Sequence, residues 1–325
     1  MNRKIQSLSF VFACMVPLIH LTSFGGADFD VYTASWWFYS VVCHGVAMIA
    51  VPFFFFVSGY LLAKHNVGKW LNGDHITEIR KRCKSLLIPM IIWGILWWVI
   101  VFRFRCNLLD CVGLCLSIPR YDPLWYLRTL FLFVCLSPLI LQLAQRRFVL
   151  GCLFAISIVY PLLVPSGSFF TFLRYFVSPL GAFYFALGMG VQRQYYSVCL
   201  NKGVGIISMI VGLVILSLKC LQIDCHHFTT VISSIATPLF LYGIWSVVPQ
   251  FTIPKLLHGT SMLIYLSHEF VIYALFVAMR ICGLRNSDFM IYVINAFLVV
   301  FLTVSVATIM RSKFPITSKI LTGGR

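Results

Sequence analysis

The sequence predicts an all-α, polytopic integral membrane protein with about ten transmembrane helices and both termini in the cytoplasm. Of its 325 residues, 60% are hydrophobic and only 10% are charged, whereas soluble domains usually carry about 25% charged residues. The mean hydropathy is +0.94. The apolar residues occur in long runs, and most of the cations lie between these runs. We therefore expect lipid to be the solvent for most of the protein surface.

Ten apolar runs are long enough to be considered as membrane spans. A helix needs about 20 apolar residues to cross the hydrocarbon core, and only helices are expected because lipid offers backbone groups no hydrogen-bond partner. The connections are too short for a separate soluble domain, so we expect one transmembrane domain over residues 1–325. The predicted spans are residues 5–22, 43–62, 86–103, 124–143, 148–164, 175–191, 203–218, 228–248, 260–281 and 289–310.

The cations between the runs predict the orientation. With the N-terminus inside, the inner segments hold 17 of the 25 Lys and Arg residues and the outer segments hold 7. This asymmetry follows the positive-inside rule and places both termini in the cytoplasm. The membrane also explains the net charge of +16, so no nucleic-acid partner is expected.

Few ionisable residues lie inside the predicted spans. His20 lies near the outer end of the first span, Arg128 one turn into the fourth, and His268 and Glu269 near the middle of the ninth. Charged side chains there cost about 2.5 to 3.5 kcal/mol on insertion scales, so they are functional candidates by default. The structural alternatives are a neutral histidine bonded to one neighbour and an ion pair between Arg128 and Glu269.

The sequence contains no glycine-rich phosphate loop, no zinc-ligand spacing and no serine nucleophile elbow. We therefore expect no metal site and no permanently bound cofactor. A histidine without a matched nucleophile favours a general base that acts directly on a bound substrate. His20 is the candidate, because an imidazole with an ordinary pKa near 6.5 suits proton removal at neutral pH.

Five strings, in order along nearly the whole chain, resemble the acyltransferase-3 family of integral membrane acyltransferases. They are MVPLIH at residues 15–20, PFFFFVSGY at 52–60, KRCKSLLIP at 81–89, PLWYL at 123–127 and IYLSH at 264–268. The resemblance implies transfer of an acyl group, commonly acetyl from acetyl-CoA, to hydroxyls of cell-envelope glycans, with His20 catalytic. It also implies the cytoplasmic (inner) membrane of a bacterium, and as partners the lipid bilayer, acyl-CoA and a glycan or lipid-linked sugar acceptor.

The chain departs from the family pattern at two places. Many members carry an arginine eleven residues before the first-helix histidine, where this chain has Ser9. The family's two arginines spaced three apart correspond here to Arg82 and Ser85, or to Lys81 and Lys84.

The densest cluster of inner cations, at residues 80–84, is the candidate for holding the phosphates of coenzyme A. It lies in the sequence at the expected N-terminal end of the third span, where backbone amides and positive side chains favour phosphate. The alternative is that these cations only set the topology and contact anionic lipid. The donor-binding candidates are Arg80, Lys81, Arg82, Lys84 and Ser85.

The remaining candidates belong to the reaction itself. Ser58, Tyr265 or Arg128 could stabilise the oxyanion, and Glu269 or His268 could orient His20. Trp125 and Tyr126 could stack on a sugar or belong to an interfacial aromatic belt.

Two other classes of function stay open from the sequence. A transporter or flippase for a glycan or lipid could use His20 and Glu269 as a proton relay without covalent chemistry. A non-catalytic membrane scaffold is the third, and Ser9 is the residue that favours it.

Overall fold

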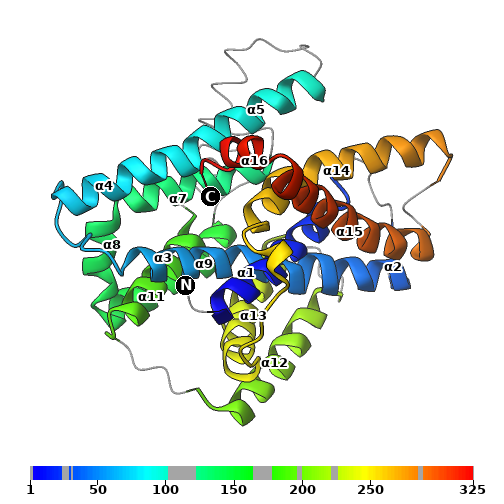
Figure 1. The fold of residues 1–325 in the computed structure, drawn as a ribbon. Helices are drawn as coiled ribbons and strands as arrows, with labels where there is room; N and C mark the ends of the chain where they lie inside the picture. Colours follow the sequence, from blue (N-terminus) through cyan, green and yellow to red (C-terminus); the bar gives the residue numbers. More distant parts are fainter. Residues whose placement is uncertain are drawn as a thin grey trace. The chain divides into compact units, whose positions relative to one another are not determined.

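The structure is a computed structural model that describes residues 3–23, 29–30, 32–101, 122–163, 178–195, 200–220, 226–284 and 288–324. Within these ranges it is helical and contains no strand (Figure 1). Four helical runs in these ranges are long and apolar enough to cross a membrane, and a fifth if one bent pair is counted as a span. This confirms the all-α membrane class, while the ten spans and the cytoplasmic termini stay predictions. Among the predicted orienting cations, the following lie outside the described residues: Arg103, Arg105, Arg120, Arg174, Arg285 and Arg325.

The chain forms two compact units that alternate along the sequence. The first unit comprises residues 1–51 and 200–315, and the second comprises residues 52–199 and 316–325. The prediction of a single domain over residues 1–325 stays a prediction.

The first unit combines the N-terminal helix with the helices of the C-terminal part of the chain. Helix α14 (Ser261–Ile281) packs against α1 (Arg3–Ile19) and α15 (Phe289–Lys313), and α12 (Lys202–Ser217) packs along α13 (His226–Val247) (Figure 1). A buried cluster joins the turn after α1 to the helices around it. Its members are Leu21, Cys43, Ile272, Tyr292, Ala296 and Val299.

The second predicted span is longer than expected and changes its helical form. A continuous helical run covers residues 34–62 and consists of α2 (Ala34–Trp37), a π-helix η1 (Phe38–Val46), a 3₁₀ turn η2 (Ala47–Ile49) and α3 (Ala50–Leu62). It begins at residue 34 because the Thr33 side chain accepts a hydrogen bond from the Trp36 amide. Long π-helical segments are rare and frequently mark functional positions.

The helix that contains the third predicted span begins well before residue 86. Helix α4 (Gly73–Arg82), the π-helix η3 (Cys83–Leu87) and α5 (Ile88–Ile100) form one run that begins at the Asn72 cap (Figure 1). Hydropathy misses α4 because it is polar. Pro89 cannot donate a backbone hydrogen bond, and the π-helical turn lies directly before it. The basic residues 80–84 therefore lie inside a helix, and no helix N-terminus is present there to bind phosphate.

The fourth predicted span is broken. Helix α7 (Trp125–Cys135) ends one residue before α8 (Ser137–Ala144), and the two axes differ in direction by 76°. Pro138 stands at the start of α8 and donates no backbone hydrogen bond, which favours a new helix at that point.

Two glycines bring α3 and α11 (Pro179–Gln192) together in the second unit. A Cβ on Gly59 would overlap the Phe185 carbonyl, and a Cβ on Gly188 would overlap the Phe56 carbonyl. Small residues at such positions let helix backbones pack closely in membranes. Gly59, in the string PFFFFVSGY, thus has a packing role.

Candidate active site

Helix α14 carries three of the predicted site residues on one face. Tyr265 lies three residues before His268 and four before Glu269, so its side chain is on the same face of the helix as each of them. All three are buried: His268 is 0% exposed and Glu269 3%. Ile272, one turn further along, belongs to the buried cluster that fixes this helix in the first unit.

His20 reaches the same place from the end of α1. The helix contains Pro17 and ends at Ile19, so His20 lies in the first turn after it, with its carbonyl accepting a hydrogen bond from the Ser23 amide at 2.9 Å. The next residue, Leu21, is 4% exposed and belongs to the same buried cluster as Ile272. The core therefore holds the turn that carries His20 against the helix that carries Glu269.

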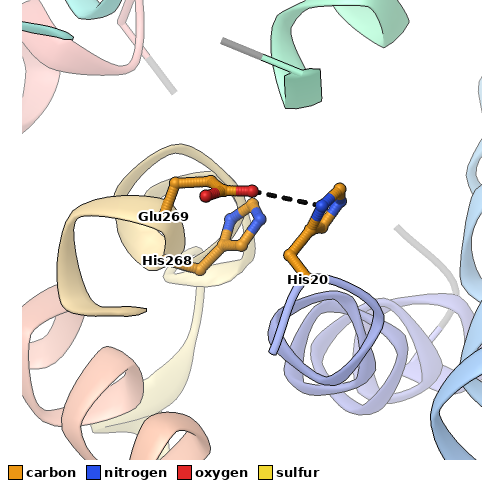
Figure 2. A group of neighbouring side chains, drawn as sticks. All are labelled: His20, His268 and Glu269. Atoms are coloured by element: carbon orange, nitrogen blue, oxygen red, sulfur yellow. Dashed lines mark ion pairs between the residues drawn. The ribbon is translucent and has the colours of Figure 1, made fainter. Parts of the chain in front are cut away.

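His20 and Glu269 lie within hydrogen-bonding distance of each other. The distance from Nδ1 of His20 to Oε1 of Glu269 is 3.1 Å, and the two side chains are 15% and 4% exposed (Figure 2). When the imidazole is neutral, its Nδ1–H donates to the carboxylate and the lone pair lies on Nε2. A carboxylate that fixes a histidine in this way selects the tautomer that a general base needs.

His268 lies beside this pair. Its ring centroid is 5.2 Å from that of His20, and the two rings are tilted by 44°. Its Nδ1 lies 2.7 Å from the Tyr265 carbonyl, to which it can only donate. Of the two sequence candidates for orienting His20, Glu269 is therefore the one placed at a nitrogen of His20, and His268 is bonded within its own helix.

The three side chains also form a potential metal-ligand set. One donor atom from each of His20, His268 and Glu269 lies within 4.8 Å of the others. The sequence shows no zinc-ligand spacing because these ligands come from opposite ends of the chain. The arrangement is suited both to proton transfer and to cation binding.

His44, a neighbour of His20, and Lys219, which bonds to His44, had no predicted role. His44, in the π-helix η1, interacts electrostatically with His20 and hydrogen-bonds the backbone of Ile19. Its ring centroid lies 4.4 Å from that of Tyr39, and its carbonyl accepts from Lys219 Nζ at 2.5 Å. The sequence signal was a histidine inside an apolar run, whereas Lys219 resembled an ordinary loop cation.

The second unit brings together some of the predicted acceptor-binding residues. The hydroxyls of Ser58 and Tyr126 lie 3.4 Å apart. Phe55 contacts both Trp125 and Tyr126, with ring centroids 6.2 and 4.7 Å away. Arg128, on α7, is 6% exposed. The two aromatic residues therefore pack on the aromatic run, and their stacking on a sugar stays a prediction.

The predicted donor-binding cations divide into two groups. Lys81 and Arg82 pair with the buried Glu78 at 2.8 and 3.8 Å, which offsets part of their charge. Arg80 and Lys84 are exposed. The spacing of Glu78 three and four residues before two cations was a signal for this pairing that the prediction missed.

Ser85 is covered by the end of the chain. It is 8% exposed, and a Cβ on Gly323 would overlap Ser85 and the Lys84 carbonyl. The Trp93 indole also donates to the carbonyl of Leu321, the last residue of α16 (Pro315–Leu321), at 3.0 Å. Ser85 is therefore buried under the C-terminal residues, and its part in donor binding stays a prediction.

The helices define a membrane protein, and His20 and Glu269 form a histidine–carboxylate pair that is largely shielded from solvent. The chain belongs to the acyltransferase-3 family, whose sequence profile, described as an acyltransferase domain, matches residues 4–311. It is therefore a membrane acyltransferase, and the resemblance seen in the five strings is confirmed. Comparison with curated proteins and with solved structures finds no match.

Proposed function

We propose that this membrane acyltransferase moves an acyl group, acetyl as the first candidate, from acyl-CoA to a hydroxyl of a cell-envelope or exported polysaccharide. The observation that carries the proposal is the 3.1 Å pair between His20 and Glu269. The pair supplies an oriented base between two helices, α1 and α14, that are otherwise mostly apolar. The polysaccharide acceptor and the bacterial inner membrane rest on the family's usual activity.

In the proposed reaction His20 acts as the general base. Nε2 of His20 takes the proton of the acceptor hydroxyl as its oxygen attacks the thioester carbonyl. The carbon–sulfur bond then breaks, the coenzyme A thiolate leaves, and the imidazolium returns the proton to the sulfur. Glu269 stabilises the imidazolium and fixes the ring through Nδ1.

The oxyanion of the tetrahedral intermediate needs a hydrogen-bond donor. Ser58, Tyr265 and Arg128 remain the proposed donors, because a hydroxyl or a guanidinium aimed at the developing charge lowers the barrier. Trp125 and Tyr126 remain the proposed sugar-stacking residues. No soluble cofactor other than the acyl-CoA substrate is needed for these steps.

A transfer assay tests the proposal. Purified protein in lipid nanodiscs is incubated with acetyl-CoA carrying a labelled acetyl group and with an envelope polysaccharide extract. We expect label in the polysaccharide fraction, in an ester that mild alkali releases. Uptake that depends on a proton gradient, with no covalent label on any acceptor, would instead support the transporter in which His20 and Glu269 relay protons.

Arg80 and Lys84 are the cations of the inner group that we expect to contact the donor phosphates, because Lys81 and Arg82 already pair with Glu78. The double variant Arg80→Ala/Lys84→Ala should raise the KM for acetyl-CoA about tenfold, the effect of losing two charge-assisted contacts of roughly 0.7 kcal/mol each. The kcat should change little. The control is Lys202→Ala, which removes an exposed cation at the start of α12. An unchanged KM in the double variant would leave these cations with a topological role only.

A further inference from the structure

We propose that His20, His268 and Glu269 bind one divalent cation of the zinc class, and that the bound ion prevents His20 from accepting a proton. The binding half stands on the geometry of the three side chains. The inhibitory half rests on the proposed function, because it concerns the base of that reaction.

The ligand set fits zinc. Two imidazole nitrogens and one carboxylate oxygen form a His₂Glu set, which zinc uses in sites that keep a fourth position open. Bonds of about 2.0 to 2.2 Å in a tetrahedron place ligand atoms roughly 3.3 to 3.5 Å apart. Nδ1 of His20 and Oε1 of Glu269 are already 3.1 Å apart. The three donor atoms lie within 4.8 Å of one another, so the His20 or His268 side chain must rotate for all three to reach one ion.

The unpaired ring nitrogen of His268 is a second, independent indication of a bound ion. The side chain is fully buried, and Nε2 has no hydrogen-bond partner among the residues that the structure describes. Buried polar atoms are nearly always paired, so an orphaned imidazole nitrogen calls for an occupant. With Nδ1 donating to the Tyr265 carbonyl, Nε2 carries a lone pair and cannot donate.

This tautomer is the one found in metal-binding histidines. A ligating imidazole usually donates its other N–H to a carboxylate or a backbone carbonyl, which fixes the ring and raises the basicity of the ligating nitrogen. The Tyr265 carbonyl plays that part for His268 at 2.7 Å. Figure 2 shows the His268 ring beside the Glu269 carboxylate and on the side of it that faces His20.

Metal binding and base catalysis then exclude each other. A neutral imidazole has one nitrogen lone pair, which can bind either a cation or a proton. An ion held by His20 takes that lone pair, and binding becomes weaker as falling pH protonates the ligands. Zinc should therefore inhibit acyl transfer reversibly, and a chelator should restore it.

Cobalt absorption tests the binding half without any transfer assay. Purified full-length protein in nanodiscs is titrated with Co²⁺, and Zn²⁺ is then added to displace it. We expect one saturable ion per chain, at least about 100-fold weaker binding in His268→Gln and Glu269→Gln, and unchanged binding in His65→Ala. His65 is a suitable control because it is an exposed histidine of the other unit.

The outcomes are distinguishable. No saturable site in the wild type, or wild-type affinity in the folded His268→Gln variant, overturns the inference. If His268→Gln elutes as an aggregate, Glu269→Gln decides, because the amide keeps the shape of the carboxylate. Binding without inhibition of transfer overturns the inhibitory half. A protein that binds the ion but transfers no acetyl group refutes the proposed function and leaves the binding half standing.

Discussion

Replacing His20 with alanine should lower the rate of acetyl transfer by about 10² to 10⁴, the usual contribution of a positioned general base. The loss should appear in kcat, because in the proposed reaction His20 acts on the acceptor hydroxyl and not on the phosphates of the donor. The side chain is 15% exposed and belongs to a turn outside α1, so its removal should leave the helices intact. The measurement is the initial rate with labelled acetyl-CoA in nanodiscs.

A matched control separates chemistry from folding in this experiment. His65→Ala removes an exposed histidine of the other unit and should keep wild-type transfer. Both variants should elute and melt as the wild type does. Wild-type transfer by a well-folded His20→Ala protein would show that the base lies elsewhere.

Replacing Glu269 with glutamine should lower kcat by about 10² to 10⁴ as well, because an amide neither selects the required tautomer nor stabilises the imidazolium. Glutamine has nearly the same size, so the packing of α14 on α1 should survive. Glu269→Asp keeps the charge on a shorter stem and should recover part of the rate. The KM for acetyl-CoA should stay within about twofold of the wild type in both variants, since a positioning residue acts on the chemical step.

The comparison of the two Glu269 variants is the informative part. If Glu269→Asp loses as much activity as Glu269→Gln, then the shape of the side chain matters more than its charge. Wild-type kcat in Glu269→Gln would mean that the carboxylate has only a structural role beside His20.

The sequence predicted the apolar helices of the second half closely. The bounds of α12, α13, α14 and α15 fall within a few residues of the predicted spans. At these helices hydropathy changes sharply between the apolar run and its polar flanks. Polar caps act in the same place, for example Asn201 and Asp288, whose side chains accept from the first helical amides.

Hydropathy did not predict the helix bounds where a helix is polar, nor whether a helix continues or bends at a proline. Residues 73–82 are helical although they are mostly polar, which moved the basic cluster from a helix end to a helix interior. Pro89 lies in a run that continues, whereas Pro138 begins a helix after a sharp bend. Both prolines lie in the first turn of a helix, so the position of the proline alone does not predict the bend.

The members of the site were predictable one at a time, and their contact was not. The cost of an ionisable group in lipid identified His20, His268 and Glu269 separately. The choice between Glu269 and His268 as the partner of His20 depends on how α14 is rotated against α1. That rotation comes from the packing of Leu21 and Ile272 in one buried cluster, which no local pattern contains.

The most direct test of His20 as the base is chemical rescue of His20→Ala. Transfer of labelled acetyl is measured with added imidazole at pH values on both sides of its pKa. The account predicts that free imidazole restores part of the lost rate, in proportion to the concentration of its neutral form, and restores none in Glu269→Gln, where the ring of His20 is present. A His20→Ala protein that transfers acetyl at the wild-type rate without imidazole would contradict it.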